Sequence, residues 1–247
     1  MNHVHNKQQG FTLIELSLAM AFISMLLLGI ATTIIQVGAI YNKGTVSKDV
    51  NQLSREINVD LDRNISAASS LDLTTDYVYS PASATAATAD GGRLCLGSYS
   101  YVWNYARALA SDSPGVTKFQ SGLSTVIRLV KVPDPGRAYC AKNLSSGVLL
   151  NKYILPADDS KVQELLKVGD HELGLHSFVF TTPPASATDL NTGQQIYSVS
   201  YIIGTTRISS LNSTQTACLT ANITNADPVY CTIQQFSLVV RTGNGVN

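Results

Sequence analysis

The chain has 247 residues, of which 14% are charged, and its 17 Lys and Arg are balanced by 17 Asp and Glu. This charged fraction is well below the roughly 25% of ordinary soluble domains. The even balance lacks the basic surplus of a protein that binds nucleic acid through charge alone. The length suits one large domain or two modest ones.

The apolar residues are concentrated near the N-terminus, where residues 11–35 carry a single charge, Glu15. As an α-helix this segment is about 37 Å long, enough to cross a bilayer core of about 30 Å. We therefore predict that residues 11–35 span a membrane. An ionised carboxylate in hydrocarbon costs roughly 2.5 kcal/mol or more, so Glu15 needs a compensating partner.

Neither of two common targeting signals accounts for the whole of this N-terminus. A cleaved secretory signal places its apolar stretch before a small-residue site, but only residues 11–18 precede Ala19-Met20-Ala21. A plain signal anchor fits better, because Lys7 and Lys43 bracket the apolar span, but it leaves Glu15 without a role.

The segment GFTLIEL, Gly10 to Leu16, follows a short leader that bears Lys7 and resembles the class III leader of type IV prepilins and pseudopilins. The resemblance implies that a membrane prepilin peptidase removes the leader, residues 1–10, by cutting between Gly10 and Phe11. It also implies methylation of the new Phe11 amine and a need for Glu15 in methylation or assembly. The Glu15 carboxylate can pair with the Phe11 amine of a neighbouring subunit, because paired buried charges cost far less than one alone.

Beyond residue 35 the apolar residues recur every three or four positions, at Val46, Val50, Leu53, Ile57, Leu61 and Ile65. This spacing is typical of one face of an amphipathic helix. No proline interrupts residues 11–65, so we predict one continuous helix about 80 Å long. Its first half lies in the membrane and its second half packs on a head domain.

Two features favour a minor subunit over a major pilin. Many major pilins have a proline in the membrane half of this helix, and residues 11–35 have none. The segment LSREINVDLDRNI, residues 53–65, also resembles J-type pseudopilins of type II secretion and W-type minor pilins. The resemblance implies the α+β pilin fold, in which a long hydrophobic-then-amphipathic helix packs on a mainly antiparallel β head, here residues 66–247.

Several elements of the head can be predicted directly. Residues 196–203 and 236–241 alternate apolar and polar side chains, as half-buried strands do, and residues 126–132 and 178–182 are further strand candidates. The small, polar residues 80–92 predict a loop. Ser160 and Gln163 form a capping-box pattern that predicts a short helix over residues 161–168.

The four cysteines are Cys95, Cys140, Cys218 and Cys231, and none belongs to a CxxC pair. Metal ligation is therefore poorly supported, and an even count in an exported chain favours disulfides. Of the three connectivities we favour Cys95 with Cys140 and Cys218 with Cys231, because each cysteine then pairs with its neighbour in sequence. Four reduced thiols remain the alternative for a reducing compartment.

Two clusters of ionisable residues invite a chemical interpretation. His171, Glu172 and His176 lack the HExxH spacing of a zinc site, so a solvated or hydrogen-bonded strand edge is the better interpretation. Asp158-Asp159 lacks the spaced oxygen ligands of a calcium loop. The chain has no GxSxG, P-loop or GxGxxG motif, and we predict no enzymatic activity and no cofactor.

An aromatic stripe, Tyr99, Tyr101, Trp103 and Tyr105, has the parity of one strand face. The favoured interpretation is a row packed in or on a sheet. The alternative is a surface platform that stacks DNA bases or sugar rings.

The sequence thus predicts a non-enzymatic minor pilin or pseudopilin that joins or primes a type IV pilus or a type II secretion pseudopilus. The alternative is a pilus-tip adhesin or DNA-uptake receptor, with glycan or DNA as ligand. The expected partners are prepilin peptidase, other pilin subunits, the inner-membrane assembly platform and membrane lipid. The protein is expected to cross the inner or cytoplasmic membrane once, with its head outside the cytoplasm, until it enters a filament.

Overall fold

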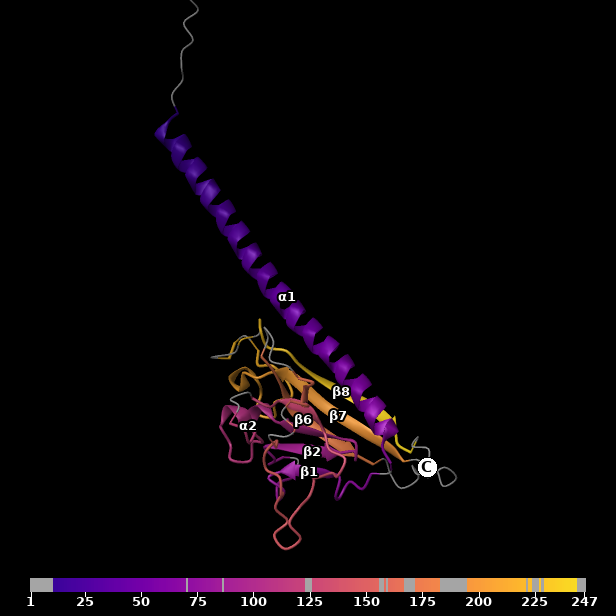
Figure 1. Ribbon diagram of the computed structural model, residues 1–247. Helices are drawn as coiled ribbons and strands as arrows, with labels where there is room; N and C mark the ends of the chain where they lie inside the picture. The colour runs from indigo at the N-terminus through magenta and orange to yellow at the C-terminus, as the bar shows by residue number, and fades with distance from the viewer. Residues whose placement is uncertain are drawn as a thin grey trace, which may run out of the picture.

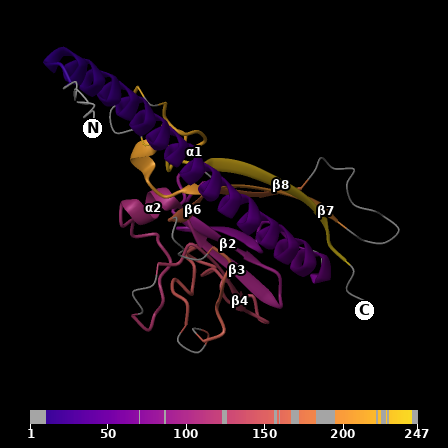
Figure 2. The ribbon, with the colours of Figure 1, turned by 90° about the horizontal axis from the view of Figure 1, so that it is seen from above.

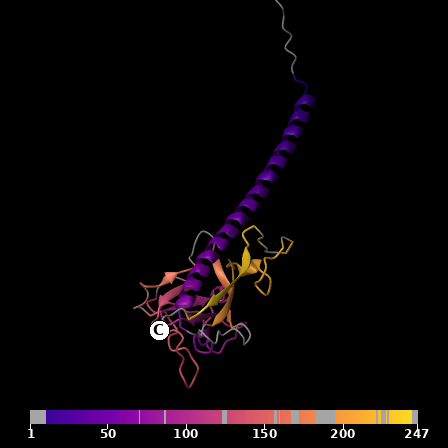
Figure 3. The ribbon, with the colours of Figure 1, turned by 90° about the vertical axis from the view of Figure 1, so that its right-hand side faces the viewer.

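A computed structural model describes residues 11–69, 71–85, 87–122, 126–155, 158, 160–166, 172–182, 195–220, 222–223, 227 and 229–243. A single long helix, α1 (Leu13–Ala67), extends from a β-rich head (Figure 1). Its first half stands clear of the head and its second half lies on it, as a perpendicular view also shows (Figure 3).

Helix α1 is unbroken over its 55 residues, a length of about 80 Å. The predicted continuous helix is therefore confirmed, with ends that differ from residues 11 and 65 by two positions each. The absence of proline allows this length, because every backbone N–H inside the helix can donate to a carbonyl one turn earlier. The helix ends where Ala68 adopts an extended backbone, with φ −75° and ψ 150°.

The head contains two antiparallel sheets. The first has the strand order β1-β2-β3-β4-β5 and the second the order β6-β7-β8. The strands of the first sheet are β1 (Tyr77–Ser80), β2 (Gly91–Cys95), β3 (Tyr99–Asn104), β4 (Leu129–Pro133) and β5 (Gln163–Glu164). Those of the second are β6 (Leu173–Thr181), β7 (Ile196–Thr205) and β8 (Ile233–Arg241), and the short helices are α2 (Ala106–Ala110) and η1 (Ile208–Ser210).

The main core lies where α1 meets both sheets. Viewed from above, α1 crosses the head with β7 and β8 on one side and β2, β3 and β4 on the other (Figure 2). Val46, Val50, Ile57, Leu61 and Ile65 of α1 are fully buried in this core, which confirms their predicted amphipathic face. A second cluster of buried side chains, which includes Val102, Val130 and Val132, belongs to the first sheet and its loops. These features confirm the α+β class.

The predicted strands are confirmed in type, with shifted ends. Residues 196–203 lie in β7, residues 236–241 in β8, most of residues 178–182 in β6, and the end of residues 126–132 in β4. Between Ser80, which ends β1, and Gly91, which begins β2, the described residues form the predicted loop.

The helix predicted over residues 161–168 is wrong within the described residues, because Gln163 and Glu164 form β5 against Lys131 and Val130. The backbone N–H groups of Leu165 and Leu166 both donate to the Leu129 carbonyl, at 3.0 and 3.2 Å. Pairing with β4 and burial of these leucines thus override the local capping signal. Residues 167–168 lie outside the described residues.

Candidate functional site

The N-terminus of α1 is capped by reciprocal hydrogen bonds between Thr12 and Glu15. Thr12 Oγ1 accepts from the Glu15 backbone N–H at 3.3 Å, and Glu15 Oε2 accepts from the Thr12 N–H at 3.0 Å and from its hydroxyl at 2.8 Å. This is a capping box, which stabilises the first helical turn by satisfying N–H groups that the helix leaves free. Glu15 and Phe11 are both exposed, whereas Gly10 lies outside the described residues.

Sequence reasoning assigned Glu15 an assembly role but missed Thr12. The signal was present, because a threonine followed three residues later by glutamate, just before an apolar run, is the signature of a capping box. Both hydrogen bonds that Thr12 donates go to Oε2 of Glu15. Among the described residues, Oε1 of Glu15 accepts no hydrogen bond and is open to a further donor.

Within the described residues, no part of the head covers the first half of α1. Every residue from Phe11 to Gly38 is exposed, including Leu13, Phe22 and Ile35 at 86%, 68% and 72%. An apolar run of this length on an isolated helix is unlike the surface of a soluble domain. The protein thus has one N-terminal helix that is long and apolar enough to cross a membrane.

The second half of α1 is fixed to the first sheet by Asp60. Its carboxylate forms an ion pair with Lys131 of β4 and accepts a hydrogen bond of 2.7 Å from the Tyr101 hydroxyl of β3. Burial and the neighbouring Asp60 charge both raise the pKa of Tyr101 far above its usual value, so the phenol stays a donor. The helix is therefore held by charge and hydrogen bonds as well as by its apolar face.

On the other side, α1 is tied to the second sheet. Tyr201 of β7 donates to Asn58 Oδ1 at 2.7 Å, and Gln234 of β8 donates to Ser47 Oγ at 3.0 Å. Closer to the exposed half of the helix, Asn42 Nδ2 donates to the Tyr230 hydroxyl at 3.1 Å. Among the described residues, this is the side-chain hydrogen bond between the head and α1 that lies nearest to the exposed half of the helix.

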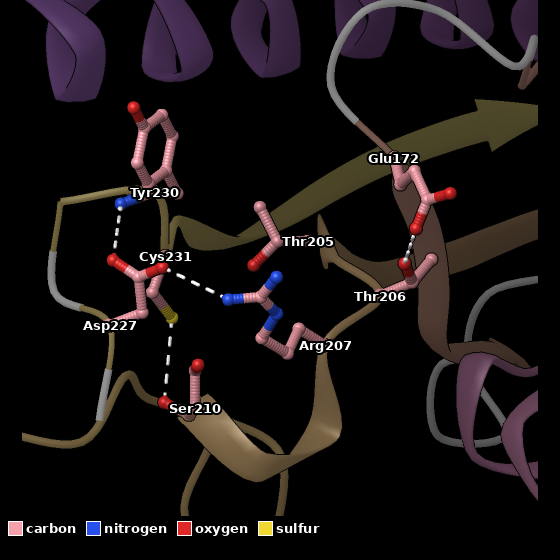
Figure 4. A pocket seen from close by; sticks show the side chains of 8 residues that line it. All are labelled: Glu172, Thr205, Thr206, Arg207, Ser210, Asp227, Tyr230 and Cys231. Carbon is pink, nitrogen blue, oxygen red and sulfur yellow. Dashed lines mark hydrogen bonds and ion pairs between the residues drawn. The ribbon is translucent and has the colours of Figure 1, made fainter. Parts of the chain in front are cut away.

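Tyr230 stands at the rim of a cavity of about 360 Å³, lined by Glu172, Thr205, Thr206, Arg207, Ser210, Asp227, Tyr230 and Cys231. Figure 4 shows its ring beside α1, with Arg207 and Asp227 below it. Arg207 pairs with Asp227 at 3.1 Å, and the Thr206 hydroxyl donates to Glu172 at 3.3 Å. Arg207 and Asp227 therefore compensate each other, and Glu172 accepts a hydrogen bond from a neighbouring strand end.

Both predicted disulfides are present, Cys95–Cys140 and Cys218–Cys231. The first joins the end of β2 to the loop after β4. The second closes the loop before β8, and its Cys231 is the residue that follows Tyr230 in the chain. The alternative of four reduced thiols is therefore wrong.

The aromatic stripe is part of the core. Tyr101, Trp103 and Tyr105 are 0%, 0% and 2% exposed, and the Trp103 ring lies 4.5 Å from that of Phe178 on β6. Tyr99 alone is exposed, at 37%, and Lys131 Nζ lies 5.0 Å from its ring centre. A surface platform of these four residues is thus excluded, and the packed-row interpretation is confirmed, because α1 and the second sheet cover this face.

His176 is buried on β6, where its ring nitrogens lie 3.1 Å from Gln215 Oε1 and 3.0 Å from the Thr205 carbonyl oxygen. His171 lies outside the described residues. Asp158 accepts a hydrogen bond of 2.7 Å from the Tyr139 hydroxyl, and Asp159 also lies outside the described residues. Within the described part of the chain, no group of three or more His, Cys, Asp and Glu side chains is arranged to hold a metal ion.

A second cavity, of about 370 Å³, has Arg93, Lys152 and Tyr153 among its lining residues. Arg93 donates to the carbonyls of Tyr139 and Asn151 and has no accessible surface. Burial lowers the pKa of Arg93 to about 10. Arg93 therefore ties two loop segments to β2 through their carbonyl groups.

The chain was compared with family models, with curated proteins and with solved structures, and none of them matches it.

Proposed function

We propose that this protein is a minor pilin or pseudopilin, anchored in the inner or cytoplasmic membrane by α1 until it joins or primes a type IV pilus or a type II secretion pseudopilus. The observation that carries the proposal is the segment GFTLIEL at the start of a 55-residue unbroken helix. The exposed half of that helix begins at the expected cleavage site. The described part of the head packs on the other half, and the apolar half is exposed and available to lipid or to neighbouring helices.

The capping box supports a specific role for Glu15. Oε2 is occupied by Thr12 of the same chain, so Oε1 is the atom that would receive the methylated Phe11 amine of an adjacent subunit. Such a pair compensates two charges that would each be costly in hydrocarbon. Prepilin peptidase, the assembly platform and other pilin subunits are the partners that this proposal requires.

The buried aromatic stripe weakens the alternative of an adhesin or DNA receptor. That alternative depended on Tyr99, Tyr101, Trp103 and Tyr105 as a stacking surface, and three of these side chains have almost no accessible surface. A subunit whose head caps or primes a filament is therefore the better-supported function.

The leader is tested by processing in a host that has a prepilin peptidase. Gly10→Val should leave the longer, unprocessed chain, because a β-branched side chain blocks the close approach of the protease to the backbone. Gln9→Val, one residue earlier, is the matched control and should be cleaved. Normal processing of Gly10→Val would overturn the proposal.

The role of Glu15 is tested separately by two substitutions. Glu15→Gln keeps an acceptor oxygen for Thr12 but removes the charge, whereas Glu15→Val removes both. If the charge pairs with Phe11 of a neighbour, both variants are cleaved and both fail in methylation or filament assembly. Assembly restored by Glu15→Gln would show that the carboxylate acts only as a helix cap.

A further inference from the structure

We infer that the end of the head nearest the exposed half of α1 rests on the bilayer surface, with the Tyr230 ring in the headgroup layer. This inference rests on the proposed membrane anchoring of α1, and it adds a second contact between the protein and the lipid. The loops between β7 and β8, which include Tyr230, lie at this end of the head (Figures 1 and 3).

The length of α1 sets the depth of this contact. As a helix, residues 11–41 span about 46 Å, or about 43 Å along the bilayer normal at a typical tilt of about 20°. A bilayer with its headgroup regions is about 40–45 Å thick. Asn42, which bonds to Tyr230, therefore lies at the outer headgroup level when Phe11 lies at the opposite surface.

The side chains at this level suit a membrane interface. The Tyr230 side chain is 50% exposed, and Tyr41 on α1 is 70% exposed next to Asn42. Tyrosine is enriched at membrane interfaces because its ring is apolar and its hydroxyl is polar. Lys43 is exposed on the same helical turn and can reach a lipid phosphate.

Tyr230 is held in place before any lipid is present. Its backbone N–H donates to Asp227 Oδ1 at 3.4 Å, and the other carboxylate oxygen of Asp227 pairs with Arg207 (Figure 4). The next residue, Cys231, is fixed by its disulfide with Cys218. Because these contacts already fix Tyr230 and Cys231, contact with lipid loses little conformational entropy. Arg207 and Asp227 are paired with each other, and the half-exposed ring of Tyr230 is open to the membrane beside them.

The opposite end of the head supplies a matched control. Tyr153 is 48% exposed, nearly the same as Tyr230, but it belongs to the long connection between β4 and β5. That connection extends away from the exposed half of α1 in both side views (Figures 1 and 3). Tyr153 should therefore stay in water when Tyr230 touches lipid.

The test uses the full chain in phosphatidylcholine vesicles whose acyl chains carry bromine, a short-range quencher of tryptophan fluorescence. Three variants are compared: Tyr230→Trp, Tyr153→Trp and Leu27→Trp, the last in the middle of the exposed half of α1. The native Trp103 is buried in the head and gives a constant background. We expect Leu27→Trp to lose most emission with bromine near the acyl-chain ends, and Tyr230→Trp to lose most with bromine next to the headgroups. Tyr153→Trp should lose none.

The outcomes separate the two proposals. If Leu27→Trp is quenched and Tyr230→Trp behaves like Tyr153→Trp, the surface contact is overturned while the membrane anchor stands. If Leu27→Trp is not quenched, the anchor fails and the surface contact fails with it. Quenching of Tyr230→Trp only after anionic phosphatidylglycerol is added would assign the contact to Lys43 and overturn Tyr230 as the anchoring residue.

Discussion

Asp60 of α1 forms an ion pair with Lys131 of β4, so that one carboxylate joins the long helix to the first sheet. The two side chains are only 18% and 11% exposed, and the Tyr101 hydroxyl also donates to Asp60. The interface between the head and α1 therefore includes a polar contact that is shielded from water.

Lys131→Met should weaken this interface. The Asp60 carboxylate would stay shielded from water but would lose the cation that pairs with it. We expect the free energy of unfolding to fall by roughly 1–3 kcal/mol, measured by urea denaturation. Lys118→Met is the control, since its ion pair with Asp112 is largely exposed, and it should cost under about 1 kcal/mol. Equal losses in the two variants would contradict a special role for the Asp60 pair.

Gly92→Ala should destabilise the head through Trp103. A Cβ at position 92 would lie 2.5 Å from Cζ2 of the Trp103 ring, which is itself fully buried. Overpacking of this kind costs typically about 1–3 kcal/mol, which thermal or urea unfolding would measure. Gly136→Ala, where a Cβ meets nothing within 4 Å, should leave stability nearly unchanged. An unchanged Gly92→Ala variant would show that the sheet yields without cost.

Loss of the Cys218–Cys231 disulfide should loosen the Tyr230 loop. In the double variant Cys218→Ser, Cys231→Ser, we expect stability to fall by about 3 kcal/mol on the chain-entropy model for a loop of this size. Backbone amide exchange should also become faster at Tyr230 and around Asn42, because their side-chain contact depends on that loop. Unchanged exchange at both places would show that the loop is held without the disulfide.

His176 should make the head less stable in mild acid. Burial, with a smaller contribution from Arg107, lowers the pKa of His176 below 6.5, although hydrogen bonds to the Gln215 and Thr205 oxygens raise it. Below pH 6.5 the unfolded chain therefore binds a proton that the folded chain does not, and the free energy of unfolding falls as the pH drops. A single group gives a slope of at most about 1.4 kcal/mol per pH unit.

Urea unfolding at about pH 7.5 and about pH 5.5 measures this slope, because these two pH values lie on either side of the ordinary histidine pKa. In His176→Gln the part of the slope due to His176 should vanish, while the remaining pH dependence stays. The same slope in both proteins would assign it to other groups.

The elements that could be predicted from the sequence are those whose signal is local. The apolar spacing from Val46 to Ile65 and the absence of proline predicted α1, and alternation predicted β7 and β8. The Thr12–Glu15 capping box is equally local and was readable. The failed helix near Gln163 shows the limit, because a contact with β4, distant in sequence, decides the conformation there.

The contacts that fix the head on α1 could not be predicted in this way. Asn42 and Tyr230 are 188 residues apart in sequence, and neither sits in a pattern that indicates the other. The same is true of Asp60 and Lys131, which are 71 apart. Such pairs result from the register of whole elements, which a single sequence leaves open.

The most direct test of the proposed function is the N-terminal mass of the chain purified from membranes of a host with a prepilin peptidase. Peptide mass spectrometry should find a chain that begins at Phe11 and carries one methyl group on its amine. An N-terminus that retains the first ten residues, or that starts at any residue other than Phe11, would contradict the account.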